Sequence, residues 1–144
     1  AEYFGIEISE TASMAAEQKL TRVLVGNVET LALPWPENHF DALIISEVLE
    51  HLVDPWRTLA RLNPLLRSGA MVLSSSPNVS QFRVIRSLIG GRWELTDAGV
   101  MDRTHLRWFT PKSYADLFNQ TGFVVDDISP VTPFSTKARA INLA

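Results

Sequence analysis

Apolar residues of this chain fall into two patterns that alternate along its length. Short continuous apolar runs, typical of buried parallel strands, predict strands at residues 3–8, 22–26, 40–45, 70–75 and 123–128. Helical spacing and capping residues predict helices at 9–19, 55–67, 80–89 and 110–122. Such alternation indicates an α/β fold in which crossovers build a mostly parallel sheet. We therefore predict a Rossmann-like, doubly wound sheet within a three-layer αβα arrangement.

Proline and glycine mark where the predicted helices begin and end. Asp54 followed by Pro55 is typical of a helix N-terminus, because proline needs no hydrogen-bond partner at the first helical position. Pro64 lies inside the same helix and is expected to kink or shorten it. Gly122 is expected to end the last helix in a left-handed conformation.

Composition and charge are those of an ordinary globular domain. The chain has 144 residues, 46% hydrophobic and 20% charged, so one partial domain spanning 1–144 is expected. It has no cysteine, no signal-peptide pattern and no apolar run near the ~18 residues of a membrane span. The net charge of −3 combines ten acids and three bases in residues 1–60 with six acids and ten bases in 61–144. Because the sequence has no dense basic stripe, we expect no nucleic-acid partner. We also expect a cytoplasmic protein without a membrane partner.

The most unusual feature is a strand end at residues 40–55, FDALIISEVLEHLVDP. A buried strand is followed at once by Ser46 and Glu47, and then by Glu50 and His51. Ligands of open α/β sheets bind beyond the carboxyl ends of the strands. If the turn is helical, Glu47, Glu50 and His51 share one face. We therefore predict a ligand site at this strand end.

This stretch resembles the fourth strand and following loop of class I S-adenosylmethionine-dependent methyltransferases, in the type 11/12 small-molecule group. A second resemblance is the pattern His-x-Arg-x-Phe-Thr at residues 105–110, which in type 12 relatives leads into the helix before strand six. The resemblance implies S-adenosylmethionine as the cofactor and the sheet order 3-2-1-4-5-7-6. It also implies a small-molecule acceptor, anionic or sugar-related, and a glycosyltransferase as an expected neighbour.

The resemblance also implies cofactor contacts at the strand ends. They are Glu7, Ile8, Asn27, Val28, Ser46 and Glu47. Glu7 would accept hydrogen bonds from the ribose, because a carboxylate offers two acceptor oxygens to a vicinal diol. The alternative is a carboxylate that faces solvent. Asn27 stands where the family usually has Asp, so its neutral amide oxygen would accept more weakly from the adenine amino group. An asparagine in an ordinary turn is the alternative there.

Acceptor chemistry is expected from His51 and from a substrate-side arm formed by residues 80–109. His105 is the preferred general base, because imidazole titrates near neutral pH, and His51 is the second candidate. The expected acceptor contacts are Arg92, Arg103, Arg107 and Trp108. Alternatively, His105 and Arg107 only anchor an irregular loop.

No metal is predicted. A similar Glu-x-x-Glu-His set, here Glu47, Glu50 and His51, is linked to a divalent ion in ubiquinone-biosynthesis O-methyltransferases, which this chain resembles. The same letters also occur in relatives without metal, and spacing alone has a high false-positive rate.

Two family features do not occur in the sequence: the glycine-rich GxGxG loop after strand one, and the seventh strand. The predicted domain is therefore incomplete at both ends. Without strand one, strands 3–8 and 40–45 would each have an unfilled edge, and unpaired buried backbone groups cost ~1–3 kcal/mol each. We expect that the missing strand is supplied by the rest of the protein, or by a second chain through homodimerisation or strand exchange. Direct pairing of these two strands is the alternative.

Three functional hypotheses follow from these patterns. The first is an S-adenosylmethionine-dependent methyltransferase that acts on a small-molecule acceptor. The second is a non-catalytic methyltransferase-like remnant that serves as a structural or interaction module. The third is an unrelated doubly wound ligand-binding domain, whose sheet order would differ. Binding of the methyl donor separates the first hypothesis from the second.

Overall fold

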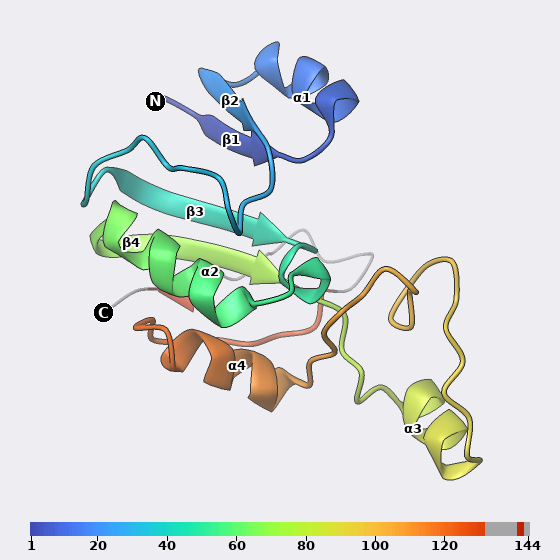
Figure 1. Cartoon of the computed structure of the whole chain (residues 1–144). Helices are drawn as coiled ribbons and strands as arrows, with labels where there is room; N and C mark the ends of the chain where they lie inside the picture. The colour runs from blue at the N-terminus through green and yellow to red at the C-terminus, as the bar shows by residue number, and fades with distance from the viewer. Residues whose placement is uncertain (132–140, 143–144) are drawn as a thin grey trace. The chain divides into compact units, whose positions relative to one another are not determined.

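The computed structural model describes residues 1–131 and 141–142, which divide between two compact units (Figure 1). The first unit is residues 1–34, and the second begins at residue 35 and runs to the end of the chain. Each unit contains its own pair of parallel strands and at least one helix. Both are therefore α/β assemblies, as the alternating sequence pattern predicts.

The first unit is a parallel strand pair joined by a helix. Its elements are β1 (Phe4–Glu7), α1 (Glu10–Glu17) and β2 (Arg22–Val25). The strands pair along their whole length and end with Glu7 opposite Val25. Ser9 begins α1, because its hydroxyl accepts a hydrogen bond from the Ala12 N–H at 3.3 Å. The carboxyl ends of both strands therefore lie at the same edge of this sheet.

The second unit is built on a three-stranded sheet. Its strands are β3 (Phe40–Ser46), β4 (Leu66–Ser75) and β5 (Ile141–Asn142), in the order β3-β4-β5. β3 and β4 are parallel and end together, with Ser46 opposite Ser75. β5 is antiparallel to β4. It takes the place beside β4 that the family order gives to strand seven, although no seventh strand is predicted from the sequence.

Helix α2 (Pro55–Leu62) is shorter than the sequence predicts. Asp54 caps it as expected, since its Oδ1 accepts from the Arg57 N–H at 2.9 Å. A 3₁₀ turn at Asn63–Leu65 then replaces the last helical turn, and β4 follows at once. Pro64 is the physical cause, because proline lacks an N–H and its ring clashes with the preceding helical turn.

Helix α4 (Pro111–Asn119) packs against α2 and completes the apolar core of the second unit. The largest fully buried apolar side chains of this core are Leu49, Leu59, Val72, Leu117 and Phe118. Full burial of one such side chain contributes ~1.5–3 kcal/mol. The Trp56 Nε1–H donates to Gln120 Oε1 at 3.0 Å and so joins the start of α2 to the end of α4.

Helix α3 (Phe82–Ile89) lies away from the sheet, between two irregular connections (Figure 1). Val84 is its one buried residue. Residues 92–109 contain no helix or strand, as their lack of period predicts. The Val79 N–H donates to the Phe109 carbonyl oxygen at 2.9 Å, which joins the two ends of the arm. Neither α3 nor any other helix of the described residues is long and apolar enough to cross a membrane.

The prediction of a strand at 123–128 is wrong. Phe123 is buried, but the segment has no ladder partner within the described residues. In the family order strand six lies beside strand seven, and β5, which stands in that place, is only two residues long, so the apolar run at 123–128 has little strand to pair with among the described residues. Among the described strands, β1 pairs with β2 only and β3 with β4 only. The alternative of direct pairing between β1 and β3 is therefore not observed.

Candidate active site

Glu7 and Gly26 bring the carboxyl ends of β1 and β2 together. The Gly26 N–H donates to the Glu7 carbonyl oxygen at 2.9 Å. One carboxylate oxygen of Glu7 accepts from the Ser9 N–H at 2.9 Å. The other has no hydrogen-bond partner among the described residues, and the next residue, Ile8, is 72% exposed. This strand end can therefore offer a ligand both an acceptor oxygen and an apolar side chain.

Asn27 forms a turn that limits what its side chain can offer a ligand. Its Oδ1 accepts from the Glu29 N–H at 2.8 Å and so closes an Asx turn. The Asn27 carbonyl oxygen accepts from the Thr30 N–H at 3.0 Å. The turn is the alternative that the sequence leaves open. An amide oxygen still keeps a second lone pair, so the turn does not prevent contact with a ligand. Val28, next in the chain, is half-buried.

Ser46 and Glu47 lie at the carboxyl end of β3. The hydroxyl oxygens of Ser46 and Ser75 are 2.8 Å apart, and the Glu47 N–H donates to the Ser75 carbonyl oxygen at 3.1 Å. Glu47 has a φ of 52°, in the left-handed region that non-glycine residues seldom adopt. Backbone strain of this kind persists where the surrounding structure fixes it, often at functional sites.

Glu50 joins the acidic turn to the arm. It belongs to the short 3₁₀ helix η1 (Leu49–His51), which follows β3. Its carbonyl oxygen accepts from the Leu106 N–H at 2.8 Å and from the Arg107 N–H at 3.0 Å. These two bonds hold the His-x-Arg-x-Phe-Thr motif against the acidic turn, although the two motifs are far apart in the sequence.

Glu50, His51 and His105 form a cluster of possible ligand side chains. One possible ligand atom from each of these residues lies within 4.8 Å of the others. Among the described residues, these three form the group of histidine and acidic side chains whose spacing suits a metal ion. The two imidazole rings are 4.8 Å apart between centroids and pack edge to face. His105 is 7% exposed, whereas His51 is open to solvent. The structure therefore brings together the two histidines that the sequence predicts as catalytic candidates.

Backbone carbonyl groups orient both imidazole rings. Nδ1 of His51 lies 3.2 Å from the Thr104 carbonyl oxygen, and Nδ1 of His105 lies 3.2 Å from the Val100 carbonyl oxygen. A carbonyl oxygen only accepts hydrogen bonds, so we assign the proton to Nδ1 in each neutral ring. Nε2 of each ring then carries the lone pair and can accept a proton or bind a metal.

The carboxyl group of Glu50 is buried without a hydrogen bond. The residue is 1% exposed, and neither carboxylate oxygen has a hydrogen-bond partner among the described residues. Burial raises the pKa of Glu50 and the nearby charge of Glu47 adds to the increase, whereas the Glu50 backbone N–H, the nearby Ser76 hydroxyl and His51 act in the opposite direction without reversing it. Unpartnered buried carboxyl groups are uncommon in folded proteins, and a perturbed pKa in such a position is a mark of functional sites.

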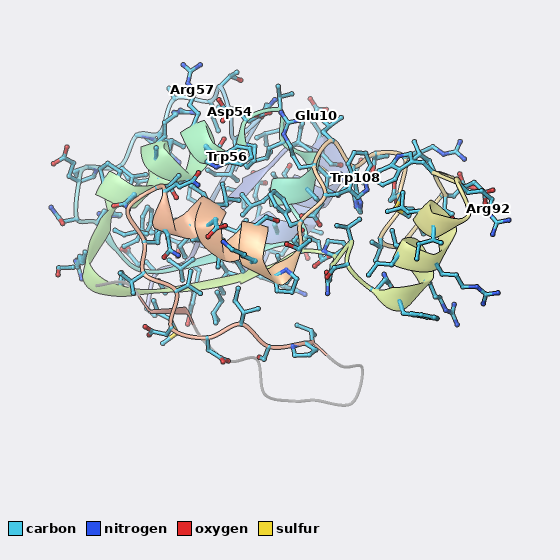
Figure 2. The ribbon with its side chains drawn as sticks, turned by 90° about the horizontal axis from the view of Figure 1, so that it is seen from below. Glu10, Asp54, Trp56, Arg57, Arg92 and Trp108 are labelled. Carbon is cyan, nitrogen blue, oxygen red and sulfur yellow. The ribbon has the colours of Figure 1, made fainter. Side chains whose placement is uncertain are left out.

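Two of the predicted acceptor contacts lie on the surface of the arm. The side chain of Arg92 is 63% exposed, and its Nε lies 3.8 Å from a carboxylate oxygen of Glu94. Figure 2 shows Arg92 at the far end of the arm, well away from Asp54 and Trp56. The side chain of Arg103 is 62% exposed and forms an ion pair with Asp97 at 2.8 Å. Both guanidinium groups therefore already have carboxylate partners.

Arg107 and Trp108 lie where the arm meets the acidic turn. The Arg107 guanidinium donates to the carbonyl oxygens of Val53 and Leu106. This geometry supports its alternative role as a loop anchor. The ring of Trp108 packs edge to face on Trp93, with 5.2 Å between centroids. Its Nε1–H is buried and has no partner among the described residues.

Tyr114 is a buried polar residue that the sequence does not single out, whereas Glu50 is predicted only as a member of the acidic turn. The Tyr114 hydroxyl is hydrogen-bonded to the Ser74 hydroxyl near the end of β4, and burial raises the pKa of the phenol. For Glu50, the available signal is its place between Glu47 and His51. That spacing does not distinguish a buried acid from an exposed one, because burial depends on contact with the distant residues 105–107.

A family model described as a methyltransferase domain matches residues 1–128, which is most of the chain. The chain belongs to this family of methyltransferase domains. The resemblance to S-adenosylmethionine-dependent methyltransferases is thereby confirmed, and S-adenosylmethionine is the cofactor that membership implies.

Two curated methyltransferases resemble this methyltransferase domain at low identity. The ubiquinone biosynthesis O-methyltransferase of Cereibacter sphaeroides is 25% identical over 111 residues, which are 77% of this chain and 45% of the relative. The demethylmenaquinone methyltransferase of Geobacillus kaustophilus is 23% identical over 151 residues, covering 91% of this chain and 64% of the relative. The chain thus spans about half the length of the first relative and less than two thirds of the second.

Solved structures of other methyltransferases have the same fold as this domain. A structure of an S-adenosylmethionine-dependent methyltransferase from Thermotoga maritima has a TM-score of 0.63 at 20% identity, over 85% of this chain and 65% of that one. One from Methanosarcina mazei has a TM-score of 0.67 at 16% identity, over 96% and 77%. These similarities confirm the predicted Rossmann-like α/β fold.

Proposed function

We propose that this methyltransferase domain transfers a methyl group from S-adenosylmethionine to the hydroxyl oxygen of a small aromatic acceptor. The observation that carries the proposal is the cluster of Glu50, His51 and His105 just beyond the carboxyl end of β3, where ligands of such sheets bind. A hydroxyl group is a weak nucleophile until it loses its proton, and the cluster offers proton acceptors. The similarity to an O-methyltransferase supports an oxygen atom as the methyl acceptor.

In the first unit, we assign Glu7 to the ribose hydroxyls of the cofactor. Its second carboxylate oxygen has no partner among the described residues, so it fits that role. The exposed Ile8 side chain is assigned to the adenine face, and Asn27 and Val28 to the adenine edge. In the second unit, Ser46 and Glu47 remain proposed cofactor contacts. When bound, the cofactor supplies an electrophilic methyl group on a sulfonium.

His51 is assigned to take the proton of the acceptor hydroxyl at Nε2. His51 is the exposed histidine of the cluster, whereas His105 is buried behind it and packs against its ring. The adjacent Glu50 carboxylate would stabilise the imidazolium that forms, because an opposite charge within about 4–6 Å favours the charged form of imidazole. The Nδ1 contacts to backbone carbonyl groups keep both rings oriented throughout.

Trp108 is the proposed acceptor contact that the geometry favours. Residues 105–107, which precede it, are held to Glu50 by two backbone hydrogen bonds. A tryptophan ring offers an apolar wall to an aromatic acceptor. Arg92 and Arg103 are exposed and ion-paired, so we assign them no direct contact with the acceptor. This geometry favours an aromatic acceptor over the anionic or sugar-related one expected from the sequence.

The same cluster has a second candidate use as a divalent-metal site. Glu50 offers a carboxylate without another hydrogen-bond partner, and His51 and His105 offer two imidazole nitrogens. Two imidazoles and one carboxylate suit transition metals such as Zn²⁺ or Mn²⁺. His105 here takes the place that Glu47 has in the Glu-x-x-Glu-His set. A bound ion would lower the pKa of an acceptor hydroxyl as a Lewis acid.

Methyl transfer from radiolabelled S-adenosylmethionine to a panel of phenols and catechols tests the proposal. The wild-type protein is expected to label at least one acceptor, and His51→Ala to lower turnover ~10²–10⁴-fold. His39→Ala changes a histidine outside the cluster and serves as the matched control. Equal turnover in His51→Ala and wild type would rule out the assigned base. Activity lost on chelation and restored by Zn²⁺ or Mn²⁺ would instead assign the cluster to a metal.

A further inference from the structure

Helix α3 carries an exposed apolar stripe. At about 100° per residue, Phe82, Ile85 and Ile89 fall within one sector of the helix surface. Their exposed fractions are 76%, 42% and 84%. Val84, the one buried residue of the helix, lies outside this sector. Large apolar side chains that are both adjacent and exposed are more typical of an interaction surface than of the rest of a protein surface.

The border of this stripe is strongly basic. Arg86 and Arg83 follow Phe82 around the helix, and neither makes an ion pair within the described residues. Between residues 55 and 93 the chain has six arginines and no Asp or Glu, although its net charge is −3. The nearest acid in sequence, Glu94, follows the helix and lies beside Arg92.

A small basic cavity lies against the same helix. Its volume is about 150 Å³, and its polar lining includes Arg83, Ser87 and Arg92, with Glu94 as the acidic member. Guanidinium and hydroxyl groups are suited to phosphate oxygens. Trp93, which also lines the cavity, is 47% exposed. Tryptophan side chains favour the boundary between apolar lipid and water.

We propose that α3 binds flat on an anionic lipid surface. The stripe of Phe82, Ile85 and Ile89 would enter the boundary between headgroups and acyl chains, and Arg83 and Arg86 would reach the lipid phosphates. A helix of eight residues is too short to span a bilayer, so the contact is peripheral. Figure 1 shows α3 projecting from the sheet of its unit, where a flat surface can reach it.

The positive charge of α3 favours an anionic lipid surface over a second copy of the chain as its partner. A symmetric contact between two α3 helices would place the arginines of one copy near those of the other. Anionic lipid instead supplies the opposite charge. The proposal adds a surface partner to a chain whose sequence predicts no membrane partner, and it does not depend on the proposed methyl transfer.

Vesicle cosedimentation with the purified protein tests this proposal. Vesicles of phosphatidylcholine alone are compared with vesicles of equal parts phosphatidylcholine and phosphatidylglycerol. The protein is expected to bind the anionic vesicles and to stay in solution with the neutral ones. Because the attraction is partly electrostatic, binding should weaken as salt increases.

Two pairs of variants separate the apolar and the charged contributions. Phe82→Ser combined with Ile89→Ser should weaken binding by at least about tenfold, because the apolar contact is lost. Met14→Ser, at an exposed apolar residue of α1, is its control. Arg83→Gln combined with Arg86→Gln should weaken binding about thirtyfold, since each arginine near an anionic surface contributes about fivefold. Arg22→Gln combined with Arg57→Gln is the charge-matched control.

Three results would overturn the lipid proposal. One is equal binding to neutral and anionic vesicles, and another is binding to neither. The third is wild-type binding by both α3 variants. Concentration-dependent self-association by sedimentation velocity, abolished in Phe82→Ser/Ile89→Ser and without vesicle binding, would identify a second copy as the occupant instead. Circular dichroism of the variants checks that these exposed substitutions leave the fold intact.

Discussion

Replacing Glu50 by glutamine should stabilise the protein while lowering its activity. Glu50 is 1% exposed, and both carboxylate oxygens lack a hydrogen-bond partner among the described residues. Glutamine has nearly the same shape but cannot ionise, so the cost of a buried charge disappears. A buried polar group without a partner costs ~1–3 kcal/mol, and more when it is charged. The glutamine amide is itself a buried polar group, so only the additional cost of the charge is removed, and we expect Glu50→Gln to raise the free energy of unfolding at neutral pH.

The stability difference between Glu50→Gln and the wild-type protein should depend on pH. Burial raises the pKa of Glu50 above its ordinary value of 4.5, so the folded state holds the proton more tightly than the unfolded state. Protonated Glu50 therefore contributes fully to the stability of the wild-type protein at a pH below its pKa in the unfolded state. This contribution is lost as the pH rises through the pKa of Glu50 in the folded state. The advantage of Glu50→Gln over wild type should therefore grow as pH rises above about 4.5 and disappear below it.

Thermal unfolding followed by circular dichroism between pH 4 and pH 8 measures this effect. For a unit of this size, 1 kcal/mol corresponds to about 4–8 °C in Tm. Glu47→Gln, at the exposed neighbouring acid, is the matched control and should change Tm little. If Glu50→Gln lowered Tm at pH 7, or shifted it equally at all pH values, the carboxylate would have a stabilising partner and the reasoning would be refuted.

Three further predictions concern the cofactor contact and the fold. Asn27→Asp restores a charged acceptor and should tighten S-adenosylmethionine binding about tenfold in calorimetry, whereas an unchanged Kd would exclude contact by this side chain. Asp54→Ala removes the side-chain cap of α2 and should cost about 1 kcal/mol in urea unfolding, with Asp126→Ala as a control outside any cap. Gly122→Ala places a Cβ 2.8 Å from Asn63 Nδ2 at a φ of +88°, so it should cost at least about 1 kcal/mol, and an unaffected urea midpoint would contradict this geometry.

Local features of the fold were predictable from the sequence because local chemistry determines them. Asp54 and Pro55 begin α2 through a cap and a fixed φ, which act within a few residues. Gly122 adopts the left-handed conformation expected after a helix. Pro64 ends α2 early, and only the form of the ending, a 3₁₀ turn, required the structure.

Features that depend on distant contacts were not predictable in the same way. The strand expected at 123–128 is not observed because β5, beside which the family order places it, is only two residues long, and a single-sequence pattern does not show how long the partner strand is. The two motifs of the candidate site were visible in the sequence. Their meeting was not, since it rests on two backbone hydrogen bonds from residues 106 and 107 to Glu50. The burial of the Glu50 carboxyl group follows from that meeting.

Calorimetric titration of S-adenosylmethionine into the purified protein measures whether this chain binds the cofactor. We expect saturable binding that Glu7→Gln weakens by about tenfold or more, because a charge-assisted hydrogen bond to the ribose is lost. Glu10→Gln, at an acid in the first turn of α1, should bind like wild type. If the wild-type protein did not bind S-adenosylmethionine, the chain would be a non-catalytic remnant rather than a methyltransferase, and equal binding by Glu7→Gln would exclude Glu7 from the cofactor site.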